Sequence, residues 1–364
     1  MFTCELKPLV DALKAAKRVT GTRNVIPVLG YAEVSTGALT VTDLGQELTM
    51  YLPDAKADAT FLLPVDPALK LLSGVKAGAL VQVEPGKVEG TLTLRAGDLT
   101  ADIDTLPISD FPRMTESTAP VLGSWALTAE ESDASWRAAA GCMSDEETRY
   151  YLRGINLCAD GKRLTFVTTD GHRLAHIQTL HPYDGPPVIV PSAAVNLALA
   201  LGLGACTLEF SQARVGIRAA GWRLVTKVVD GTFPDYWRVI PTKNTKVSAI
   251  SAPALKDAAS RIVKMLGPVV AVLDHSAQTL SASGTDGARR VAIDLPNMAA
   301  ERGEGMTTTG YNAKYLTQMS ALVSIFDDLI LWSTSDSAGD PALIQPDAQP
   351  DFAFVQFVLM PMRF

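Results

Sequence analysis

The sequence predicts an α+β protein made of three similar domains, each with two helices packed on antiparallel sheets. One strand–turn–strand motif occurs three times, at spacings close to one third of the 364 residues. A helical pattern opens each third, and segments with alternating apolar and polar residues follow it. A pattern repeated at regular spacing indicates a repeated structural unit. We therefore divide the chain into domains 1–121, 122–243 and 244–364.

The repeated motif is a Thr-Asp turn. Thr42-Asp43, Thr169-Asp170 and Thr285-Asp286 each follow one apolar strand and precede another. Asp accepts hydrogen bonds from nearby backbone amides and Gly tolerates a positive φ, so these segments are typical of hairpins. Because all three thirds contain the turn, we interpret it as structural.

Amphipathic helices are expected at the start of each third. Apolar residues at helical spacing are Leu9, Leu13, Ala16 and Thr20 in the first third, and Leu255, Ala258, Ala259, Ile262 and Leu266 in the last. Thr128 and Glu131 have the spacing of a capping box. Further helices are predicted to begin near Ser192 and at Asp66, with Pro67 in the first helical position.

The composition predicts a folded protein of a reducing compartment. Hydrophobic residues make up 47% and charged residues 20% of the chain. No secretory signal and no apolar run of about 18 residues is present, so we expect a cytoplasmic protein without a membrane partner. The four cysteines form no CxxC pair, which is typical of free thiols. The net charge of −7 leaves room only for a local basic patch.

Basic residues recur on the outward faces of the predicted helices and beside them. They are Lys14, Lys17, Arg18, Lys76, Arg137, Arg261 and Lys264. For any single helix, an ordinary solvated surface is the simpler explanation. Their recurrence in a net acidic chain favours a surface that neutralises nucleic-acid phosphates without reading the base sequence.

Four segments, in order, resemble the beta subunit of bacterial DNA polymerase III, the sliding clamp family. They are EETRYYLRG (146–154), TDGHRLA (169–175), DGTFPDYWRVIP (230–241) and VLMPMRF (358–364). The resemblance covers the whole chain and implies three DNA-clamp domains in a head-to-tail homodimeric ring around duplex DNA. It implies as partners the DNA polymerase III alpha subunit, the clamp loader and other proteins with a clamp-binding linear motif. Arg23 matches a position that the family uses near DNA.

The resemblance also implies a hydrophobic pocket between domains 2 and 3 that binds this motif. Matched residue by residue, its wall consists of Arg149, Tyr151, Leu152, Thr169, Gly171, His172, Arg173, Leu174, Pro234, Arg238, Val239, Asn312, Tyr315, Val358, Met360, Pro361, Met362 and Arg363. Only the middle turn continues with His172-Arg173-Leu174, where the first turn has Gln46-Glu47-Leu48. A difference confined to one copy indicates a local role.

Two features depart from the family pattern. The predicted helix at 192–204 has no basic residue, which argues against DNA contact there. Trp237 stands where the family commonly has a polar or basic residue, and it either widens the pocket rim or covers a neighbouring loop.

An enzyme is the main alternative class. His172 and His176 have the spacing of a zinc helix, but the Glu of HExxH is absent. In the strand that the pattern predicts, four residues span about 13 Å, too far for one metal ion. No G-x-S-x-G or P-loop motif occurs, so we predict no catalytic residue, metal or cofactor. A monomeric peptide-docking scaffold of the same fold is the second alternative.

Overall fold

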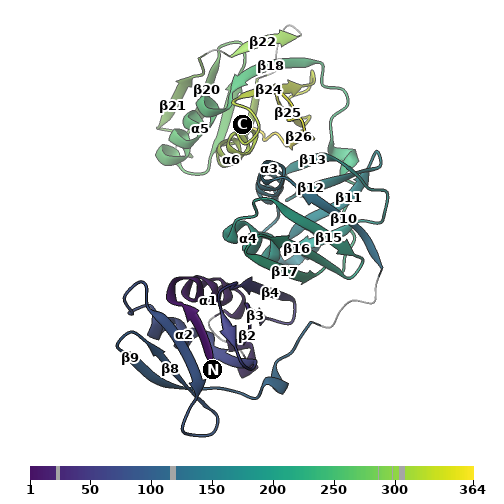
Figure 1. The fold of residues 1–364 in the computed structure, drawn as a ribbon. Helices are drawn as coiled ribbons and strands as arrows, with labels where there is room; N and C mark the ends of the chain where they lie inside the picture. The colour runs from purple at the N-terminus through teal and green to yellow at the C-terminus, as the bar shows by residue number, and fades with distance from the viewer. Residues whose placement is uncertain (22–24, 115–119, 286, 297, 303–307) are drawn as a thin grey trace. The chain divides into compact units, whose positions relative to one another are not determined.

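The computed structural model describes residues 1–21, 25–114, 120–285, 287–296, 298–302 and 308–364 (Figure 1). The chain forms two compact units. The first consists of Met1–Ala129 and Ala200–Val228, and the second of Glu130–Leu199 and Val229–Phe364. Each unit has its own helices and antiparallel sheets, which confirms the α+β prediction.

The helices of the first unit bury the faces that the sequence predicts. In α1 (Leu6–Thr20), Leu9, Leu13 and Ala16 are fully buried, and Gly21 ends the helix at φ +63°. Helix α2 (Val65–Leu72) begins at Val65, so the predicted start at Asp66 was wrong by one residue. Pro67 is the third helical residue rather than the first. Proline is accepted there because the first N–H groups of a helix have no intrahelical partner.

Two sheets complete the first unit. One has the strand order β5-β1-β7-β8-β9 and the other β10-β15-β16-β17-β4-β3-β2-β6. The first sheet contains β1 (Phe2–Glu5), β5 (Lys56–Ala57), β7 (Leu80–Pro85), β8 (Thr91–Ala96) and β9 (Leu99–Asp104). The second contains β2 (Tyr31–Ser35), β3 (Ala38–Thr42), β4 (Gln46–Tyr51), β6 (Phe61–Pro64), β10 (Val121–Leu127), β15 (Cys206–Ser211), β16 (Arg214–Ala219) and β17 (Trp222–Lys227). The 3₁₀ helices η1 (Pro27–Gly30) and η2 (Ile108–Asp110) lie in its connections.

The second unit is built on a large sheet with the strand order β14-β11-β12-β13-β26-β25-β24-β18-β22. Its strands are β11 (Gly154–Asp160), β12 (Arg163–Thr169), β13 (Arg173–Pro182), β14 (Val188–Pro191), β18 (Lys246–Ser251), β22 (Ala299–Arg302), β24 (Leu329–Thr334), β25 (Ala342–Pro346) and β26 (Ala353–Leu359). A smaller sheet, β21-β20-β19-β23, contains β19 (Val270–Asp274), β20 (Thr279–Ser283), β21 (Arg290–Asp294) and β23 (Thr309–Asn312).

Helices α5 (Ala252–Leu266) and α6 (Ala313–Val323) pack against each other in the second unit. Helix α3 (Ala129–Ala140) follows β10, and α4 (Ser192–Leu201) begins at the predicted Ser192. The predicted apolar face of α5 is buried at Leu255, Ala258 and Ile262. The 3₁₀ helices η3 (Glu147–Leu152) and η4 (Tyr236–Val239) lie in the connections between elements of the second unit.

Strands of the middle third join sheets with both of the other thirds. Strand β4, which follows the first Thr-Asp turn, pairs with β17, the last strand of the middle third. Strand β13, which follows the second turn, pairs with β26, the last strand of the chain. Because these ladders cross the predicted boundaries, the middle third contributes to both compact units. The three-domain division stays a prediction.

The first two Thr-Asp turns share one hydrogen-bond pattern. The Oδ1 atom of Asp43 accepts from the amides of Gly45 and Gln46, at 2.9 and 2.7 Å. The Oδ1 atom of Asp170 accepts from the amides two and three residues further on, at 2.9 and 3.0 Å. The structural role of the turn is therefore confirmed in both copies. These bonds show that Gln46 in the first turn corresponds to Arg173 in the second. The alignment by sequence matched Gln46 with His172 instead.

The third copy of the turn contains Asp286, which lies outside the described residues.

The four cysteines are buried free thiols, as predicted. Burial raises the pKa of Cys4 to about 11 and that of Cys142 to about 12. Both thiols are therefore neutral and unreactive at physiological pH.

Candidate functional site

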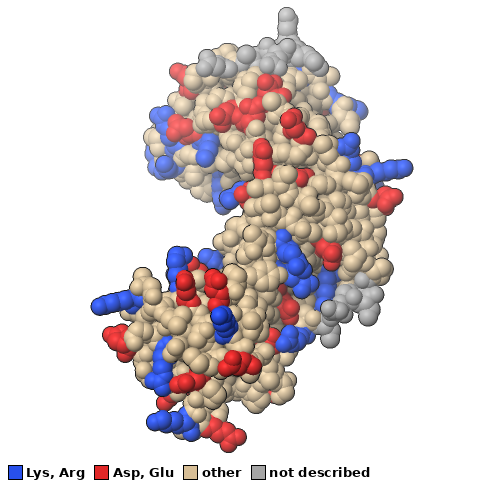
Figure 2. All heavy atoms as spheres, in the orientation of Figure 1, with Lys and Arg blue, Asp and Glu red and all other residues tan. Residues whose placement is uncertain are grey.

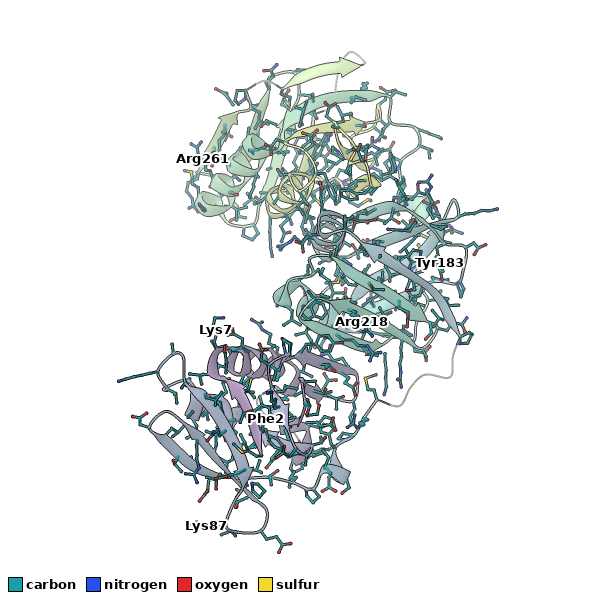
Figure 3. All side chains as sticks on the ribbon, viewed as in Figure 1. Phe2, Lys7, Lys87, Tyr183, Arg218 and Arg261 are labelled. Carbon is teal, nitrogen blue, oxygen red and sulfur yellow. The ribbon has the colours of Figure 1, made fainter. Side chains whose placement is uncertain are left out.

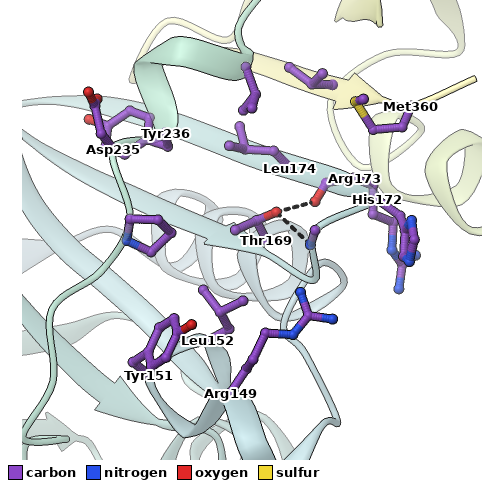
Figure 4. Close-up of a pocket in the computed structure, with 14 residues that line it drawn as sticks. Arg149, Tyr151, Leu152, Thr169, His172, Arg173, Leu174, Asp235, Tyr236 and Met360 are labelled. Atoms are coloured by element: carbon purple, nitrogen blue, oxygen red, sulfur yellow. Dashed lines mark hydrogen bonds between the residues drawn. The ribbon is translucent and has the colours of Figure 1, made fainter.

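A cavity of about 250 Å³ lies in the second unit at the ends of β12, β13 and β26 (Figure 4). It is lined by Arg149, Tyr151, Leu152, Thr169, Gly171, His172, Arg173, Leu174, Pro234, Asp235, Tyr236, Val239, Val358 and Met360. Leu174 and Val358, which are 184 positions apart in the sequence, meet here because β13 pairs with β26. Twelve of the residues predicted from the resemblance are among the fourteen.

The second Thr-Asp turn forms one wall of the cavity. The hydroxyl of Thr169 donates to the Arg173 carbonyl at 2.8 Å and accepts from the Gly171 amide at 3.1 Å (Figure 4). Gly171 has φ +90°, and a Cβ atom there would lie 2.9 Å from Arg149 Nη1. The absence of a side chain at Gly171 therefore lets the Arg149 guanidinium approach the turn.

The side chain of Arg173 ties the turn to α6. It is 8% exposed, and its Nε atom donates to Asp170 Oδ2 at 2.9 Å. Its Nη1 atom donates to Gln318 Oε1 at 2.7 Å, and the guanidinium lies 4.7 Å from the centre of the Tyr315 ring. Since its charge is already paired and its geometry fixed, we assign Arg173 the role of positioning the cavity wall.

The floor of the cavity is apolar. Leu174, Val358 and Tyr236 are buried in one cluster that also contains Val167 and Ile240. Burial is the largest cause that raises the pKa of the Tyr236 phenol, so its hydroxyl stays neutral. An apolar floor with few polar groups at its rim suits a short peptide with hydrophobic anchor residues.

Arg149 forms the charged part of the rim. Its side chain is 39% exposed and pairs with Glu146, whose Oε2 atom accepts from Arg149 Nε at 2.6 Å. Hydrogen bonds from Arg149 and Thr148 lower the pKa of the Glu146 carboxyl. The guanidinium can thus exchange this exposed pair for an acceptor on a bound molecule.

The C-terminal segment closes another side. The amide of Met360 donates to the His172 carbonyl at 2.8 Å, which extends the β13–β26 ladder past Leu359. The amide of Met362 donates to the Gly310 carbonyl at 2.8 Å. The Met360 side chain lies at the cavity, and that of Met362 is 44% exposed beyond it.

Six predicted residues do not line this cavity: Arg238, Asn312, Tyr315, Pro361, Met362 and Arg363. Asn312 caps α6, because its Oδ1 atom accepts from the Lys314 amide at 2.9 Å. Tyr315 lines an adjoining hollow with Gln318, beneath Arg173. Arg238 is exposed and pairs with Asp235 at 2.9 Å.

Sequence comparison missed Asp235 and Tyr236 as lining residues. Both stand in the segment PDYWRV, where only Pro234, Arg238 and Val239 were selected. In a 3₁₀ helix, residues i and i+3 share a face. The segment forms η4, so Tyr236 points the same way as Val239, and a 3₁₀ reading of the sequence could have found it.

Trp237 packs beside Tyr236 and His176 and is not among the residues that line the cavity. Its ring centre lies 5.2 Å from that of Tyr236 and 5.5 Å from that of His176. Trp237 therefore lies beside the cavity, and its role at the pocket rim or over a neighbouring loop stays a prediction.

The predicted DNA-contacting residues are spread over both units and are largely exposed. In α1, Lys17 pairs with Asp66, and Lys14 Nζ lies 3.9 Å from Asp11. Figure 2 shows basic and acidic side chains side by side over this helix, while Figure 3 shows Lys7 at its start. The charge of the α1 face is therefore partly balanced, and Arg18 is exposed beside it.

In the second unit, Arg137 is exposed on α3 and Lys264 on α5. Arg261 projects from α5 (Figure 3), 3.7 Å from Asp257. In the first unit, Lys76 is exposed in the loop after α2. Arg23 lies outside the described residues.

His176, on β13, contacts polar side chains through both ring nitrogens. His176 Nε2 lies 2.9 Å from Asp160 Oδ2, and its Nδ1 atom lies 3.4 Å from Gln356 Nε2. No cluster of three or more potential metal ligands occurs among the residues that the structure describes. Within the same residues, no helix has the length and apolar character needed to cross a membrane.

Comparisons with known proteins find relatives of this chain among bacterial sliding clamps. A family model described as DNA polymerase III beta subunit, central domain, matches residues 136–235. The beta sliding clamp of Proteus mirabilis is 30% identical over 273 residues, which cover 71% of this chain and 73% of the relative. That of Vibrio cholerae is 29% identical over 380 residues, which cover 100% and 99% of the two chains.

A solved structure extends this similarity to three dimensions. The sliding clamp of Bartonella birtlesii, DNA polymerase III subunit beta, bound to griselimycin, has a TM-score of 0.86 and 26% identity, with full coverage of both chains. Sequence and fold therefore agree over the whole chain, and this chain belongs to the bacterial beta sliding clamp family.

Proposed function

We propose that two copies of this chain close head to tail into a ring that encircles duplex DNA and tethers the replicative polymerase. The strand pairing carries the proposal. Twice, the strand after a Thr-Asp turn pairs with the last strand of the next third: β4 with β17, and β13 with β26. Two strands take no part in this pairing pattern within the chain. They are β21, which follows the third turn, and β9, the last strand of the first third, and both lie at sheet edges.

Pairing β21 of one copy with β9 of the other follows the same pattern between chains. Edge strands present unpaired N–H and C=O groups and are ready templates for another strand. Each copy has one β21 and one β9, so two copies use all four edges. A heterologous contact that closes in this way makes a ring rather than a filament.

Inside such a ring, the exposed cations of α1, α3 and α5 would meet phosphates. Contacts of this kind neutralise charge without reading sequence, so the ring can slide. Retention then comes from encirclement, and the protein needs no catalytic step. Replacing Lys14, Lys17 and Arg18 with Ala should weaken DNA contact at low salt and leave peptide docking unchanged.

The cavity at β12, β13 and β26 is proposed to bind the clamp-binding motif of the polymerase alpha subunit, the clamp loader and other partners. Its apolar floor and its rim of Arg149, His172 and Met360 support this assignment. Deleting Met360–Phe364 removes part of the wall without touching β9 or β21. We expect the deletion to abolish peptide binding while the dimer persists, and unchanged peptide affinity would contradict the assignment.

The mass in solution tests the ring. Light scattering should give twice 38.7 kDa for the intact protein. Val291→Lys places a charge on the half-buried face of β21 and should yield the single-chain mass. Val225→Lys, at a half-buried position of the fully paired β17, is the matched control and should remain dimeric.

A single-chain mass for the intact protein would favour the monomeric peptide-docking scaffold. Function is tested by retention on circular DNA after loading by the clamp loader, with release when the DNA is linearised. A protein that dissociates equally from both forms does not encircle DNA.

A further inference from the structure

A second hollow of about 240 Å³ lies beside the docking cavity, and residues of η4 line both spaces. It is lined by Asn156, Cys158, Ala159, Gly185, Pro187, Phe233, Pro234, Asp235, Tyr236 and Trp237. Pro234, Asp235 and Tyr236 line both spaces. The two spaces therefore adjoin at these three residues, so a peptide that extends from the docking cavity past Pro234 would approach the second hollow.

Asn156 is a polar residue in the lining of the hollow. This residue is only 2% exposed, and its Oδ1 atom has no hydrogen-bond partner in the part of the chain that the structure describes. A buried acceptor without a donor costs free energy, and an ordered water or a group of a bound molecule can supply that donor. The neighbouring Cys158 does not do so, since its thiol lies 3.6 Å from Tyr236 Oη and 3.8 Å from the Thr165 carbonyl.

Trp237 forms the outer wall and is 49% exposed. The indole packs against Tyr236 and His176, which restrict the orientation of the ring. A large aromatic side chain left half in solvent is a common anchor at interfaces. Its face attracts a cation placed within about 6 Å.

The charged groups of the hollow are acceptors. Among the residues that line the hollow, Asp235 carries a negative charge, and none is Lys or Arg. Arg238 reaches Asp235 from outside through an exposed pair, in which one carboxylate oxygen, Oδ2, accepts from Nε at 2.9 Å. A carboxylate, an unpartnered amide oxygen and an aromatic face together select a group that donates hydrogen bonds and carries positive charge.

We propose that this hollow binds an arginine side chain of the docked partner, located next to the clamp-binding motif in the partner's sequence. The inference rests on the proposed docking function and adds a charge-selective subsite to it. The guanidinium would stack on Trp237, donate to Asp235 and supply the missing donor to Asn156. Arginine fits better than lysine because its planar group can stack and donate in several directions at once.

The test uses the full-length protein and fluorescent peptides that contain the clamp-binding motif of the polymerase alpha subunit. Each peptide is extended by four residues, at its N-terminal or its C-terminal end, with either one arginine or one citrulline in the extension. Citrulline has nearly the shape of arginine but no charge. For the end that crosses Pro234, we expect the arginine peptide to bind about fivefold more tightly at low salt.

Substitution of Trp237 locates the effect. Trp237→Leu keeps an apolar side chain but removes the aromatic face, and we expect the arginine preference to fall below about twofold. Asp235→Asn should reduce the same preference. The peptide without an extension should bind Trp237→Leu as it binds the wild type. Phe354→Ala, which removes a 41% exposed aromatic side chain elsewhere in the unit, is the matched control and should keep the full preference.

The outcomes separate the two proposals. If the motif peptide binds but neither extension shows an arginine preference, the second hollow has no such role and the docking cavity stands. A preference that survives Trp237→Leu and Asp235→Asn also overturns the inference. If the motif peptide fails to bind the wild type, the docking function falls and the subsite falls with it.

Discussion

The first and second Thr-Asp turns have the same backbone hydrogen bonds but different surroundings. In both, the threonine hydroxyl donates to a carbonyl four residues further on, at 2.8 Å. In both, the second carboxylate oxygen accepts from the side chain that ends the turn, Gln46 at 3.1 Å or Arg173 at 2.9 Å. Arg173 also reaches Gln318 and Tyr315 of α6, as a longer and charged side chain can.

This comparison separates the fold from the site. The shared bonds hold a hairpin wherever the motif occurs. The residue that ends the turn decides whether the hairpin also binds a helix and shapes a cavity. The four predictions below test that division, beginning with the largest expected effect.

Replacing Arg173 with Ala should destabilise the second unit by about 3 kcal/mol, because it leaves Asp170 and Gln318 without their partner. The equivalent Gln46→Ala should cost the first unit only about 1 kcal/mol, since one weak hydrogen bond is lost. Chemical denaturation of each variant measures both values. Equal losses at the two sites would show that the bonds to α6 contribute nothing.

Replacing Thr169 or Thr42 with Val removes the same hydroxyl from each turn. We expect each change to cost about 1–2 kcal/mol, because the bond to the carbonyl is lost in a side chain of nearly unchanged shape. Only Thr169→Val should weaken binding of the motif peptide, which fluorescence anisotropy can measure. An equal effect of Thr42→Val on the peptide would place the docking site elsewhere.

Gly171→Ala introduces a side chain at φ +90°, where residues other than glycine are strained. We expect a loss of about 1–2 kcal/mol and weaker peptide binding, because the new Cβ atom would displace the Arg149 guanidinium. Gly45→Ala is the control, since no positive φ is found at Gly45. A neutral Gly171→Ala would mean that the wall tolerates a methyl group.

Leu44 occupies the position of Gly171 in the first turn, with φ +73°. Leu44→Gly should therefore stabilise the first unit slightly, by about 0.5 kcal/mol, because relief of backbone strain exceeds the greater flexibility of glycine in the unfolded chain. The midpoint of denaturant unfolding would detect the change. A clear destabilisation would show that the partly exposed Leu44 side chain packs more usefully than its backbone suggests.

Much of the site could be predicted from local sequence. The segments around Tyr151, His172, Pro234 and Met360 each carry a recognisable motif, and the structure places all four at one cavity, while their role in peptide binding stays a prediction. The adjoining Tyr236 was missed because its direction depends on the 3₁₀ turn that it occupies. Asn312 and Tyr315 match the family motif, yet here they cap α6 and support Arg173.

The sequence by itself determined the elements: amphipathic helices, alternating strands and a Thr-Asp turn whose bonds join residues within five positions of one another. Such local bonds depend on spacing that can be read along the chain. Only the tertiary structure decided that β4 joins β17 and that β13 joins β26, because pairing between distant strands depends on which edges remain free after each hairpin has formed. The pairing of β13 with β26 brings together the residues that line the cavity at the ends of β12, β13 and β26.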